Sequence, residues 1–579
     1  MQMHNHRDTQ TKVFDRRSFI TGSLAVAAGA LGAGAALTAT PPNAFAASPV
    51  EAAAAATTDF LPEAQPINPL DKPAASDEEA DVGIIGSGGA ALAAALYLSQ
   101  NNTKVLLVEK NPAWGGVTAT ASAWLCPGGT RAHAERFGIT EWDVDAQLET
   151  FLAYQAYPAT GSQRALVRKT LERGPQFFDW FIDAGGPMFL AGPGTYVSMN
   201  PDKSTRAVNA VNFAVTKAQE LGADLRLRTE CTGIVADGGR AVGIRVSDLE
   251  TLEDYFIGAR QAVLLAAGGF TSNIDMLKRW CPTVVNTVKT TAAYPGDNGA
   301  VTRMAQGLGA NMVGWDSFFA FDGGLDVDEW NHRIRDGDVQ VARQPWLGID
   351  KTGQRYPFTS SHDPINPLWN AFYQQAQTLQ GLPDSWGYVF WDSKWLEHTL
   401  AYAEAGCRAG ETPENTLRGQ ITAIDPDSWT DGVERAVKRG TIKTADSIKE
   451  VATALGIDPE VAQTAADKWN ALCAEGVDKE FNYETQWLQP LDSPPFYAAK
   501  VGSNLLSTQC GVQINPEMKV IDINGKVIEG LFAASTTIGG MIGNSSNGSG
   551  KASPFGSVAL TWITGYMAAQ GILGQTYQA

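Results

Sequence analysis

Three small residues and one acid, at a fixed spacing, mark where this chain can hold a nucleotide. Gly86, Gly88 and Ala91 follow an apolar run at 82–85 with the spacing G-x-G-x-x-A, and an Ala- and Leu-rich segment comes next. This spacing allows a tight turn, close approach of backbone to a pyrophosphate, and close packing of helix on strand. A second apolar run, 104–108, leads to Glu109, which stands where a ribose hydroxyl would be held. The pattern predicts a strand, turn, helix and strand that bind a dinucleotide, whereas an ordinary glycine-rich turn leaves the acid unexplained.

Further stretches of small residues predict other points where backbone approaches the same ligand. The turn at 114–123 directly follows Glu109, and the segments 261–270 and 530–535 have the pattern of buried strands that end in small residues. Ser553 and Pro554 suit the N-cap and first position of a final helix, whose N-terminus would stabilise negative charge on the ligand. The expected cofactor-binding residues are Gly86, Gly88, Gly89, Ala91, Glu109, Lys110, Gly115, Gly116, Val117, Thr118, Ser122, Ala267, Gly268, Ala534, Ser535, Gly550, Ser553 and Pro554.

Charge and cysteine usage exclude several classes of function. The net charge of −18, with no basic stripe, argues against nucleic acid or an anionic membrane surface as partner, because phosphate binding relies on clustered Lys and Arg. The six cysteines are scattered without a C-x-x-C pair, so the sequence offers no haem, iron–sulfur or other metal site. Isolated thiols of this kind are more often buried and apolar than catalytic.

The first 46 residues have the pattern of an export signal. Arg16 and Arg17 precede Ser18-Phe19-Ile20, an Ala- and Gly-rich apolar stretch, and the small-residue cleavage pattern at 44–46. The paired arginines indicate the twin-arginine route, with a membrane anchor as the alternative. This route exports folded proteins, often with their cofactor in place. We therefore expect a periplasmic, cell-envelope or extracellular protein that carries FAD as a prosthetic group, because diffusible NAD(P)H is not available there.

The length of 579 residues and shifts in composition predict more than one domain. We expect a linker at 47–79, a nucleotide-binding domain at 80–293 that is completed at 491–579, and between them an inserted cap at 294–490. The cap region is rich in Trp, Asp and Gly. The expected fold class is α/β, with a Rossmann-like domain and an inserted α+β capping domain.

Eight motifs together resemble the flavoprotein family of soluble fumarate reductases, urocanate reductases and 3-ketosteroid Δ1-dehydrogenases, over nearly the whole chain after residue 80. The resemblance implies noncovalent FAD, a GR2-type Rossmann-like domain as in flavocytochrome c fumarate reductase, a cap over the flavin, and hydride exchange between flavin N5 and an activated carbon–carbon bond. The motifs are GSGGAA (86–91), WGGVT (114–118), AAGGFTSN (266–273), GDNGA (296–300), DKTGQRY (350–356), PPFYAAK (494–500), GLFAAS (530–535) and GGMIGNSSNGSG (539–550).

The chain departs from this family at positions that contact substrate. Fumarate reductases hold the substrate carboxylates with a His and an Arg and protonate carbon from a cap Arg; the matching positions are Ser507, Ser546 and, with one gap, His362. Loss of two charge-assisted hydrogen bonds, roughly 1.5–3 kcal/mol each, argues against a dicarboxylate substrate. The tyrosine positions of the ketosteroid dehydrogenases match Ser546 and Asp363, whereas their ketone-polarising glycine matches Gly550.

Four residues are the catalytic candidates: His362, Tyr497, Gly550 and Arg355. His362 is the expected proton donor, because its pKa lies near neutrality and Asp363 is adjacent. Gly550 offers a backbone N–H for a carbonyl oxygen. A packing or surface role remains open for Tyr497, Arg355 and the lone His362, and Cys510 is a further candidate for substrate contact.

The sequence therefore predicts an exported FAD-dependent oxidoreductase that reduces a C=C bond conjugated to a carbonyl in a non-dicarboxylate, steroid-like or aromatic substrate. Electrons would come from a cytochrome or a quinol-linked partner, and the mature chain would have no stable membrane insertion. Three alternatives stay open: ketosteroid dehydrogenase-like oxidation, fumarate or urocanate reduction, and a noncatalytic electron-relay flavoprotein.

Overall fold

The computed structural model describes eleven stretches of the chain that together contain both predicted domains. They are residues 62–121, 123–153, 161–192, 194–198, 207–291, 296–326, 344–358, 375–399, 426–483, 485–541 and 555–575. The predicted signal segment and the first part of the predicted linker lie outside these residues. None of the helices in the described stretches has both the length and the apolar character needed to cross a bilayer.

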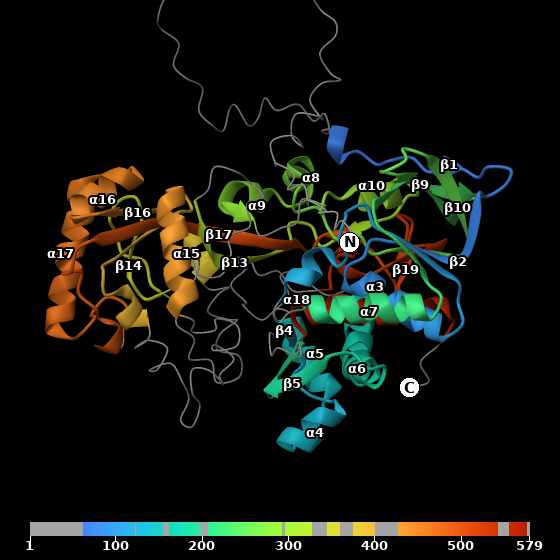
Figure 1. Ribbon diagram of the computed structural model, residues 1–579, viewed down its shortest axis with the longest axis horizontal. Helices are drawn as coiled ribbons and strands as arrows, with labels where there is room; N and C mark the ends of the chain where they lie inside the picture. Colours follow the sequence, from blue (N-terminus) through green and yellow to red (C-terminus); the bar gives the residue numbers. More distant parts are fainter. Residues whose placement is uncertain are drawn as a thin grey trace, which may run out of the picture. The chain divides into compact units, whose positions relative to one another are not determined.

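The largest sheet in the described residues has nine strands, and its strands β1, β9, β10 and β2 lie together in Figure 1. Its strand order is β1 (Leu70–Asp71), β8 (Thr229–Asp237), β9 (Arg240–Asp248), β10 (Asp254–Leu265), β2 (Glu78–Ile85), β3 (Val105–Val108) and β7 (Asp224–Arg226); β20 (Val527–Ala533) pairs with β10 and with β19 (Lys519–Ile521). The neighbours β7, β3, β2, β10 and β20 are mutually parallel, so their carboxyl ends meet at one edge. Ligands bind at that edge in open sheets of this kind.

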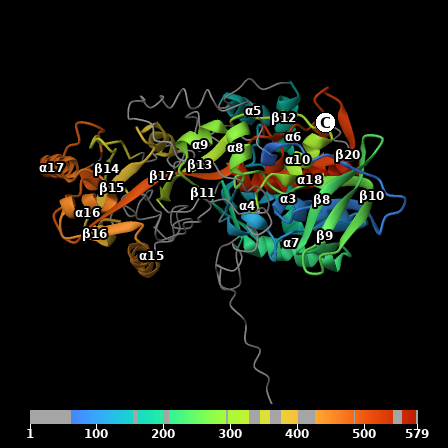
Figure 2. The same cartoon turned by 90° about the horizontal axis from the view of Figure 1, so that it is seen from above.

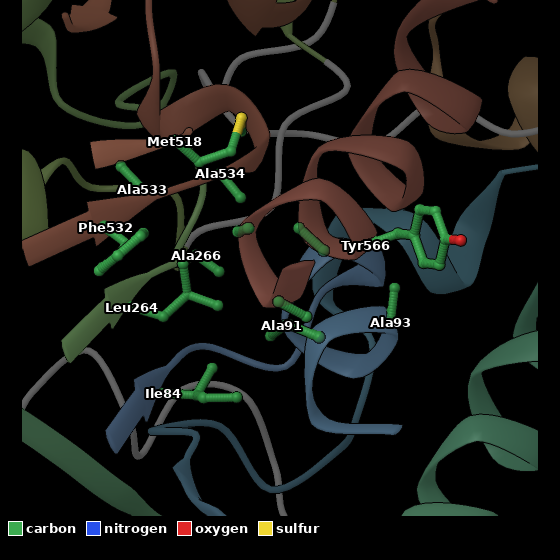
Figure 3. Packing of buried hydrophobic residues seen from close by; sticks show 14 of the residues in the cluster. Ile84, Ala91, Ala93, Leu264, Ala266, Met518, Phe532, Ala533, Ala534 and Tyr566 are labelled. Atoms are coloured by element: carbon green, nitrogen blue, oxygen red, sulfur yellow. The ribbon is translucent and has the colours of Figure 1, made fainter. Parts of the chain in front are cut away.

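Two helices without an amphipathic pattern pack into the core beside this sheet. Helix α3 (Gly89–Gln100) and helix α18 (Gly556–Ile572) are apolar on almost every side, and most of their side chains are buried. Gly565 lets α18 approach α3, because a Cβ at this position would collide with the backbone of Ala90. Figure 3 shows Tyr566 of α18 beside Ala93 of α3, with Ala91 between them and the strand residues Leu264 and Phe532.

A second sheet carries the capping elements, and β17 (Phe496–Thr508) is its central strand. The first half of β17 pairs with β15 (Gly387–Trp391) and β16 (Ile442–Ala445), and its second half pairs with β13 (Phe318–Leu325) and β11 (Thr290–Thr291). Strand β14 (Leu347–Ile349) pairs with β15. Helices α15 (Pro426–Arg439), α16 (Ile448–Leu455) and α17 (Pro459–Glu475) pack on this sheet, and Figure 2 shows α15 and α16 beside the long strand β17.

The remaining elements are short connections or lie beside the two sheets. They are η1 (Pro62–Ala64), η2 (Gly116–Thr120), β4 (Ala123–Leu125), α4 (Arg131–Phe137), α5 (Val144–Ala153), α6 (Gly161–Asp183), β5 (Met188–Gly192), β6 (Thr195–Ser198), α7 (Val208–Glu220), α8 (Ile274–Trp280), α9 (Pro282–Thr287), α10 (Ala300–Gly307), β12 (Met312–Val313), η3 (Thr485–Trp487), β18 (Gly511–Val512) and η4 (Ser535–Thr537).

The structure confirms the α/β fold class, and three segments bear on the expected domain boundaries. Residues 62–79 do not form a free linker, because β1 pairs with β8 and Ile67 donates its N–H to Arg303. Helix α10 packs on β8 and β18 rather than on the cap sheet. The segment 496–501, expected in the nucleotide-binding domain, is a cap strand, since it pairs with β15 and β16. Strand β17 therefore belongs to the second sheet along its whole length and runs from the cap strands β15 and β16 to β13 and β11, which sequence spacing did not indicate.

Candidate active site

The G-x-G-x-x-A motif forms the turn from β2 into α3, as its spacing predicts. Gly86 has φ +100°, and a Cβ there would stand 2.5 Å from the carbonyl oxygen of Ala266, which directly follows the neighbouring strand β10. Gly88 is the N-cap residue of α3. A Cβ on Gly89 would collide with the indole of Trp562 in α18. The first N–H groups of an α-helix have no acceptor within the helix, so this turn supplies donors suited to a phosphate.

Glu109 lies at the end of β3, and two neighbouring residues fix its carboxylate. The hydroxyl of Ser87 donates to one carboxylate oxygen at 2.7 Å, and the backbone N–H of Asn111 donates to the other at 2.8 Å. The Ser87 hydroxyl also accepts the N–H of Gly115 at 3.1 Å. A carboxylate has about four acceptor positions, so Glu109 keeps capacity for a ribose hydroxyl. Its side chain is buried, which shields that contact from water.

The W-G-G-V-T segment folds back onto the start of α3. Gly115 adopts φ +97°, and a Cβ there would crowd Val211 of α7. The hydroxyl of Thr118 accepts the N–H of Gly89 at 3.1 Å, so it partners one of the first donors of α3. The side chain of Val117 is 40% exposed. This turn therefore lies along one side of the sheet edge at which the nucleotide is expected to bind.

The two strand ends β10 and β20 bring further small residues to the same edge. Gly268 adopts φ +88°, and a Cβ there would collide with the carboxylate of Asp297. Asp297 accepts the N–H of Thr271 at 3.1 Å and is almost fully buried. Burial raises the pKa of Asp297, although the hydrogen bonds from Thr271 act in the opposite direction.

Ser535 follows β20 in a conformation that non-glycine residues seldom adopt. Its φ is +68°, and its N–H donates to the hydroxyl of Thr564 in α18 at 3.0 Å. The preceding residue, Ala534, is fully buried and donates its N–H to Leu265 at 2.9 Å. Strained backbone of this kind tends to occur at functional sites.

These turns enclose a cavity of about 360 Å³. It is also lined by residues from β13 and β17. The cavity therefore extends from the carboxyl ends of the parallel strands in the large sheet to two strands of the second sheet. Ten of the expected cofactor-binding residues line it: Gly86, Gly88, Glu109, Lys110, Gly116, Val117, Thr118, Ala267, Gly268 and Ser535. Gly89, Ala91, Gly115 and Ala534 lie in or beside the same turns but do not line the cavity. Ser122, Gly550, Ser553 and Pro554 lie outside the described residues.

The lining fits a flavin dinucleotide. A glycine cradle at a helix N-terminus suits the pyrophosphate, and Glu109, oriented by Ser87 and Asn111, suits the ribose. A Cβ at Gly86 or Gly268 would meet protein atoms, so the backbone there has no room for larger residues. No group of three His, Cys, Asp or Glu residues suited to a metal ion occurs in the described part of the chain.

The structure places two of the four catalytic candidates in the cap, outside the cavity lining. The Arg355 guanidinium donates to both oxygens of Asp478, at 3.1 and 2.8 Å, inside a cage formed by the rings of Trp469, Phe481 and Tyr483. Tyr497 stacks on Trp391, with ring centroids 6.1 Å apart and planes 7° from parallel. The structure thus gives both residues packing roles. His362 and Gly550 lie outside the described residues, as does Ser546.

Several residues that the sequence reasoning did not single out contribute to the site. Ser87 and Asn111 orient Glu109, Asp297 holds the Gly268 turn, and Phe319 and Phe321 line the cavity. Ser87 lies inside the G-x-G motif and Asp297 inside G-D-N-G-A. Their positions in these motifs could therefore have indicated that both residues belong to the site. Cys510, by contrast, is buried in a separate apolar cluster and does not line the cavity.

A family model described as FAD binding domain matches residues 81–552. Urocanate reductase of Eggerthella lenta is 26% identical over 488 residues, which cover 81% of this chain and 72% of the relative. Vinyl phenol reductase of Lactiplantibacillus plantarum is 23% identical over 484 residues, covering 81% and 92% respectively. NADH:fumarate oxidoreductase of Klebsiella pneumoniae is 24% identical, but this chain spans only 45% of its length.

Solved structures show the same fold. The open conformation of a flavocytochrome c3 fumarate reductase matches with a TM-score of 0.64 and 20% identity, over 86% of this chain and 79% of the other. The 3-ketosteroid Δ1-dehydrogenase of Sterolibacterium denitrificans matches with a TM-score of 0.64 and 18% identity, over 86% and 100%.

The chain belongs to the FAD-binding domain family, and its cofactor is FAD. Within that family its relatives are flavin-dependent reductases and dehydrogenases, and the chain is an FAD-dependent oxidoreductase that acts on carbon–carbon bonds.

Proposed function

We propose that this enzyme reduces a C=C bond conjugated to a carbonyl group in an uncharged substrate. The observation that carries the proposal is the composition of the cavity wall on the cap strands: Phe319 and Phe321 from β13, and Leu506 and Ser507 from β17. This wall is apolar apart from one hydroxyl. Such a surface suits a flat organic molecule with a neutral oxygen better than it suits a dicarboxylate.

The roles of the chain's own residues follow from their positions. Gly86, Gly88 and the first turn of α3 hold the pyrophosphate noncovalently, and Glu109 holds the ribose. The bound FAD supplies the hydride. The apolar strands β13 and β17 exclude water from the reacting bond. We assign proton delivery to His362 and polarisation of the substrate carbonyl to the N–H of Gly550.

The relatives support this reaction class. Proteins named for the reduction of urocanate, vinyl phenol and digoxin each match this chain over about 80% of its length. Their names cover substrates that differ in size and charge, so they support reduction of a C=C bond more strongly than any particular substrate.

Export and electron supply are part of the same proposal. The segment 1–46 would direct the folded, FAD-loaded protein through the twin-arginine pathway to the periplasm or the outer face of the cell. Because no soluble nicotinamide pool is available there, a cytochrome or a quinol-linked protein would reduce the flavin.

The proposal is tested by reducing the holoprotein under nitrogen and adding enones, cinnamates and steroids separately while flavin absorbance is recorded. We expect at least one neutral enone to reoxidise the flavin. His362→Ala should slow that reaction by a hundredfold or more, because a positioned proton donor typically contributes about that much. Flavin that stays reduced with every compound would overturn the proposed reaction and favour a noncatalytic relay. An unchanged rate in the variant would show that a group other than His362 donates the proton.

Oxidation of a 3-ketosteroid is a second candidate, because the 3-oxosteroid 1-dehydrogenase of Mycolicibacterium smegmatis is 23% identical over 386 residues, covering 61% of this chain. Steady-state assays with reduced viologen and with oxidised dye acceptors separate the two directions. Faster turnover of a saturated ketosteroid with dye than of its enone with viologen would favour this candidate.

A further inference from the structure

Residues 63–71 form a strap on the surface of the nucleotide-binding domain. Its first part packs inward, because Ala64 is only 1% exposed and belongs to the apolar cluster that contains Phe270 and Met276. Its last part is β1, which pairs in parallel with β8. The strap is therefore attached to the domain at both of its ends.

Helix α10 holds the middle of the strap. Ile67 donates its N–H to the carbonyl of Arg303 at 2.9 Å, and Nε of Arg303 donates to the carbonyl of Gln65 at 2.7 Å. A Cβ at Gly307 would stand 1.9 Å from the carbonyl oxygen of Ile67, so strap and helix approach each other backbone to backbone. The residues directly before Arg303, Ala300–Thr302, line the cavity. One short helix therefore contacts the strap and also lines the cofactor cavity.

The side chain of Asn273 joins the strap to a turn that lines the cavity. Its amide nitrogen carries two hydrogens and donates to the carbonyl of Glu63 at 3.3 Å and to that of Asn298 at 3.0 Å. Its oxygen accepts the N–H of Met276 at 3.0 Å, which caps α8 and determines which way the amide faces. Asn298 lines the cavity, so a single amide group spans the distance between strap and cavity wall.

Strand β8 is the third link between the strap and the cavity. Its residues Thr229, Glu230 and Cys231 line the cavity, and β1 pairs with its later residues Val235 and Ala236. The segments that receive the strap are thus α10, the turn before it and β8, and each of them also contributes to the cavity lining.

We propose that the strap and FAD are coupled through these three segments: the strap docks firmly only when FAD fills the cavity, and the docked strap tightens FAD binding. Each of the two restricts the motion of the same segments, so the second to bind has less motion left to restrict. Because the strap follows the segment in which we expect the export signal, cofactor loading would determine how firmly that end of the chain is held. The coupling does not depend on the substrate or on the direction of the reaction.

The first test compares hydrogen exchange in the FAD-loaded and the deflavinated protein, by mass spectrometry of peptides that contain residues 63–71. We expect the strap amides to exchange about tenfold faster without FAD, a size common for coupling between two sites. Amides of α17 are the internal control and should exchange equally in both forms. Equal exchange of the strap in both forms would overturn the coupling, even if the cavity turns themselves exchange faster without FAD.

The second test releases the strap from outside the cavity. Gly307→Ala places a methyl group against the carbonyl of Ile67, and Gly307 does not line the cavity. FAD, titrated into the deflavinated variant and followed by quenching of flavin fluorescence, should bind about tenfold more weakly than to wild type. The strap of the FAD-loaded variant should exchange at least as fast as that of deflavinated wild type. The effects on Kd and on exchange should agree in size, because coupling between two sites is reciprocal.

Gly381→Ala is the matched control for this variant. Gly381 is an exposed residue of the cap, and a Cβ there would meet open space, so FAD binding and strap exchange should stay at their wild-type values. A Gly307→Ala protein whose strap exchanges rapidly, but whose Kd for FAD equals that of wild type, would overturn the coupling.

Asn273→Asp is a second variant that decides the question if Gly307→Ala does not fold. Its carboxylate still accepts the N–H of Met276 but cannot donate to the carbonyls of Glu63 and Asn298. We expect the same two effects, a released strap and FAD binding weakened about tenfold. A released strap with an unchanged Kd for FAD would contradict the coupling here as well.

Discussion

At the scale of single residues, the cofactor site depends on groups that orient the residue in contact with the ligand. Glu109 is the acid that sequence spacing predicts, but its carboxylate is fixed by Ser87 from the glycine turn. The same Ser87 hydroxyl accepts the N–H of Gly115 and so joins the turn before α3 to the turn before η2. One hydroxyl therefore couples the two segments that surround the expected nucleotide.

Ser87→Ala should weaken FAD binding by about tenfold, because a hydrogen bond to a charged group contributes roughly 1.5 kcal/mol or more and each 1.4 kcal/mol changes Kd tenfold. The measurement is the Kd of FAD for the deflavinated protein, followed by the quenching of flavin fluorescence. Ser76→Ala is the matched control, since the Ser76 hydroxyl bonds to Glu79 outside the cavity lining. Equal Kd values for Ser87→Ala and the control would show that Ser87 does not orient Glu109 for binding.

What the sequence could predict at this scale was the set of small residues, because glycine is required where the backbone has a positive φ and close neighbours. Gly86 packs against the backbone of Ala266, Gly268 packs against the carboxylate of Asp297, and both have positive φ values. The orienting residues were harder to predict, since Ser87 and Asp297 act through contacts with residues distant in sequence. Arg355 and Tyr497 show the converse: their residue types suit catalysis, but burial against aromatic rings gives them packing contacts in the cap.

At the scale of elements, the Arg355–Asp478 pair joins two segments of the cap. Arg355 lies in the turn after β14, and Asp478 follows α17. Their side chains are 6% and 0% exposed. Burial opposes ionisation of Asp478, but the hydrogen bonds and charge of Arg355, together with the backbone N–H groups of Glu480 and Phe481, outweigh it and hold the pKa of Asp478 below its usual range.

Arg355→Met should destabilise the cap by about 3–5 kcal/mol, because it leaves a buried carboxylate without its partner. Since the folded-state pKa of Asp478 is lowered, the pair contributes stability above the usual carboxyl pKa and loses it as pH falls through the lowered value. The difference in unfolding free energy between wild type and variant should therefore be constant above pH about 5 and should shrink below pH about 4.

The control for this pair is the double variant Arg355→Met with Asp478→Leu, which removes both charges and should recover part of the lost stability. Urea unfolding, followed by tryptophan fluorescence at several pH values, measures all three proteins. If the loss of unfolding free energy in Arg355→Met stays constant down to pH 3, the Arg355–Asp478 pair is not the cause of that loss. If folded Arg355→Met protein reduces substrate much more slowly than wild type, Arg355 has a catalytic role in addition to its ion pair.

The local elements were predictable because their signals are local. The apolar runs and the glycine turn predicted β2, α3 and β3, and the structure has them in that order. The pairing of β17 was not predictable, because this strand has one pattern of apolar residues but two sets of partners, β15 and β16 at its start and β13 and β11 at its end. Its partners come from segments far away in the sequence, and spacing within β17 carries no information about them.

At the scale of the whole molecule, segments distant in the chain meet around the cavity. Its lining comes from the ends of β2, β3 and β10, from η2 and η4, and from β13 and β17. Strand pairing and hydrogen bonds already join these segments, and a ligand that contacts all of them would add further contacts. FAD should therefore be a structural component of the fold as well as the source of hydride, which is consistent with the proposal that the protein acquires it before export.

Removal of FAD should lower the unfolding free energy by the full binding contribution, which is about 2.7 kcal/mol at a free FAD concentration one hundred times Kd. Thermal unfolding of the holoprotein and of the deflavinated protein, at several FAD concentrations, measures this loss. Hydrogen exchange should show where it arises: amides in Gly116–Thr120, Gly268–Phe270 and Ser535–Thr537 should lose protection, because these turns line the cavity. Amides in α16 and α17, which pack on the cap sheet in a cluster of their own, provide the internal control and should keep theirs. If the amides of the cavity turns stay as protected as those of α16 and α17 after FAD removal, the turns keep their structure without the cofactor. A melting temperature that does not depend on FAD concentration would likewise show that FAD is not needed to join these segments.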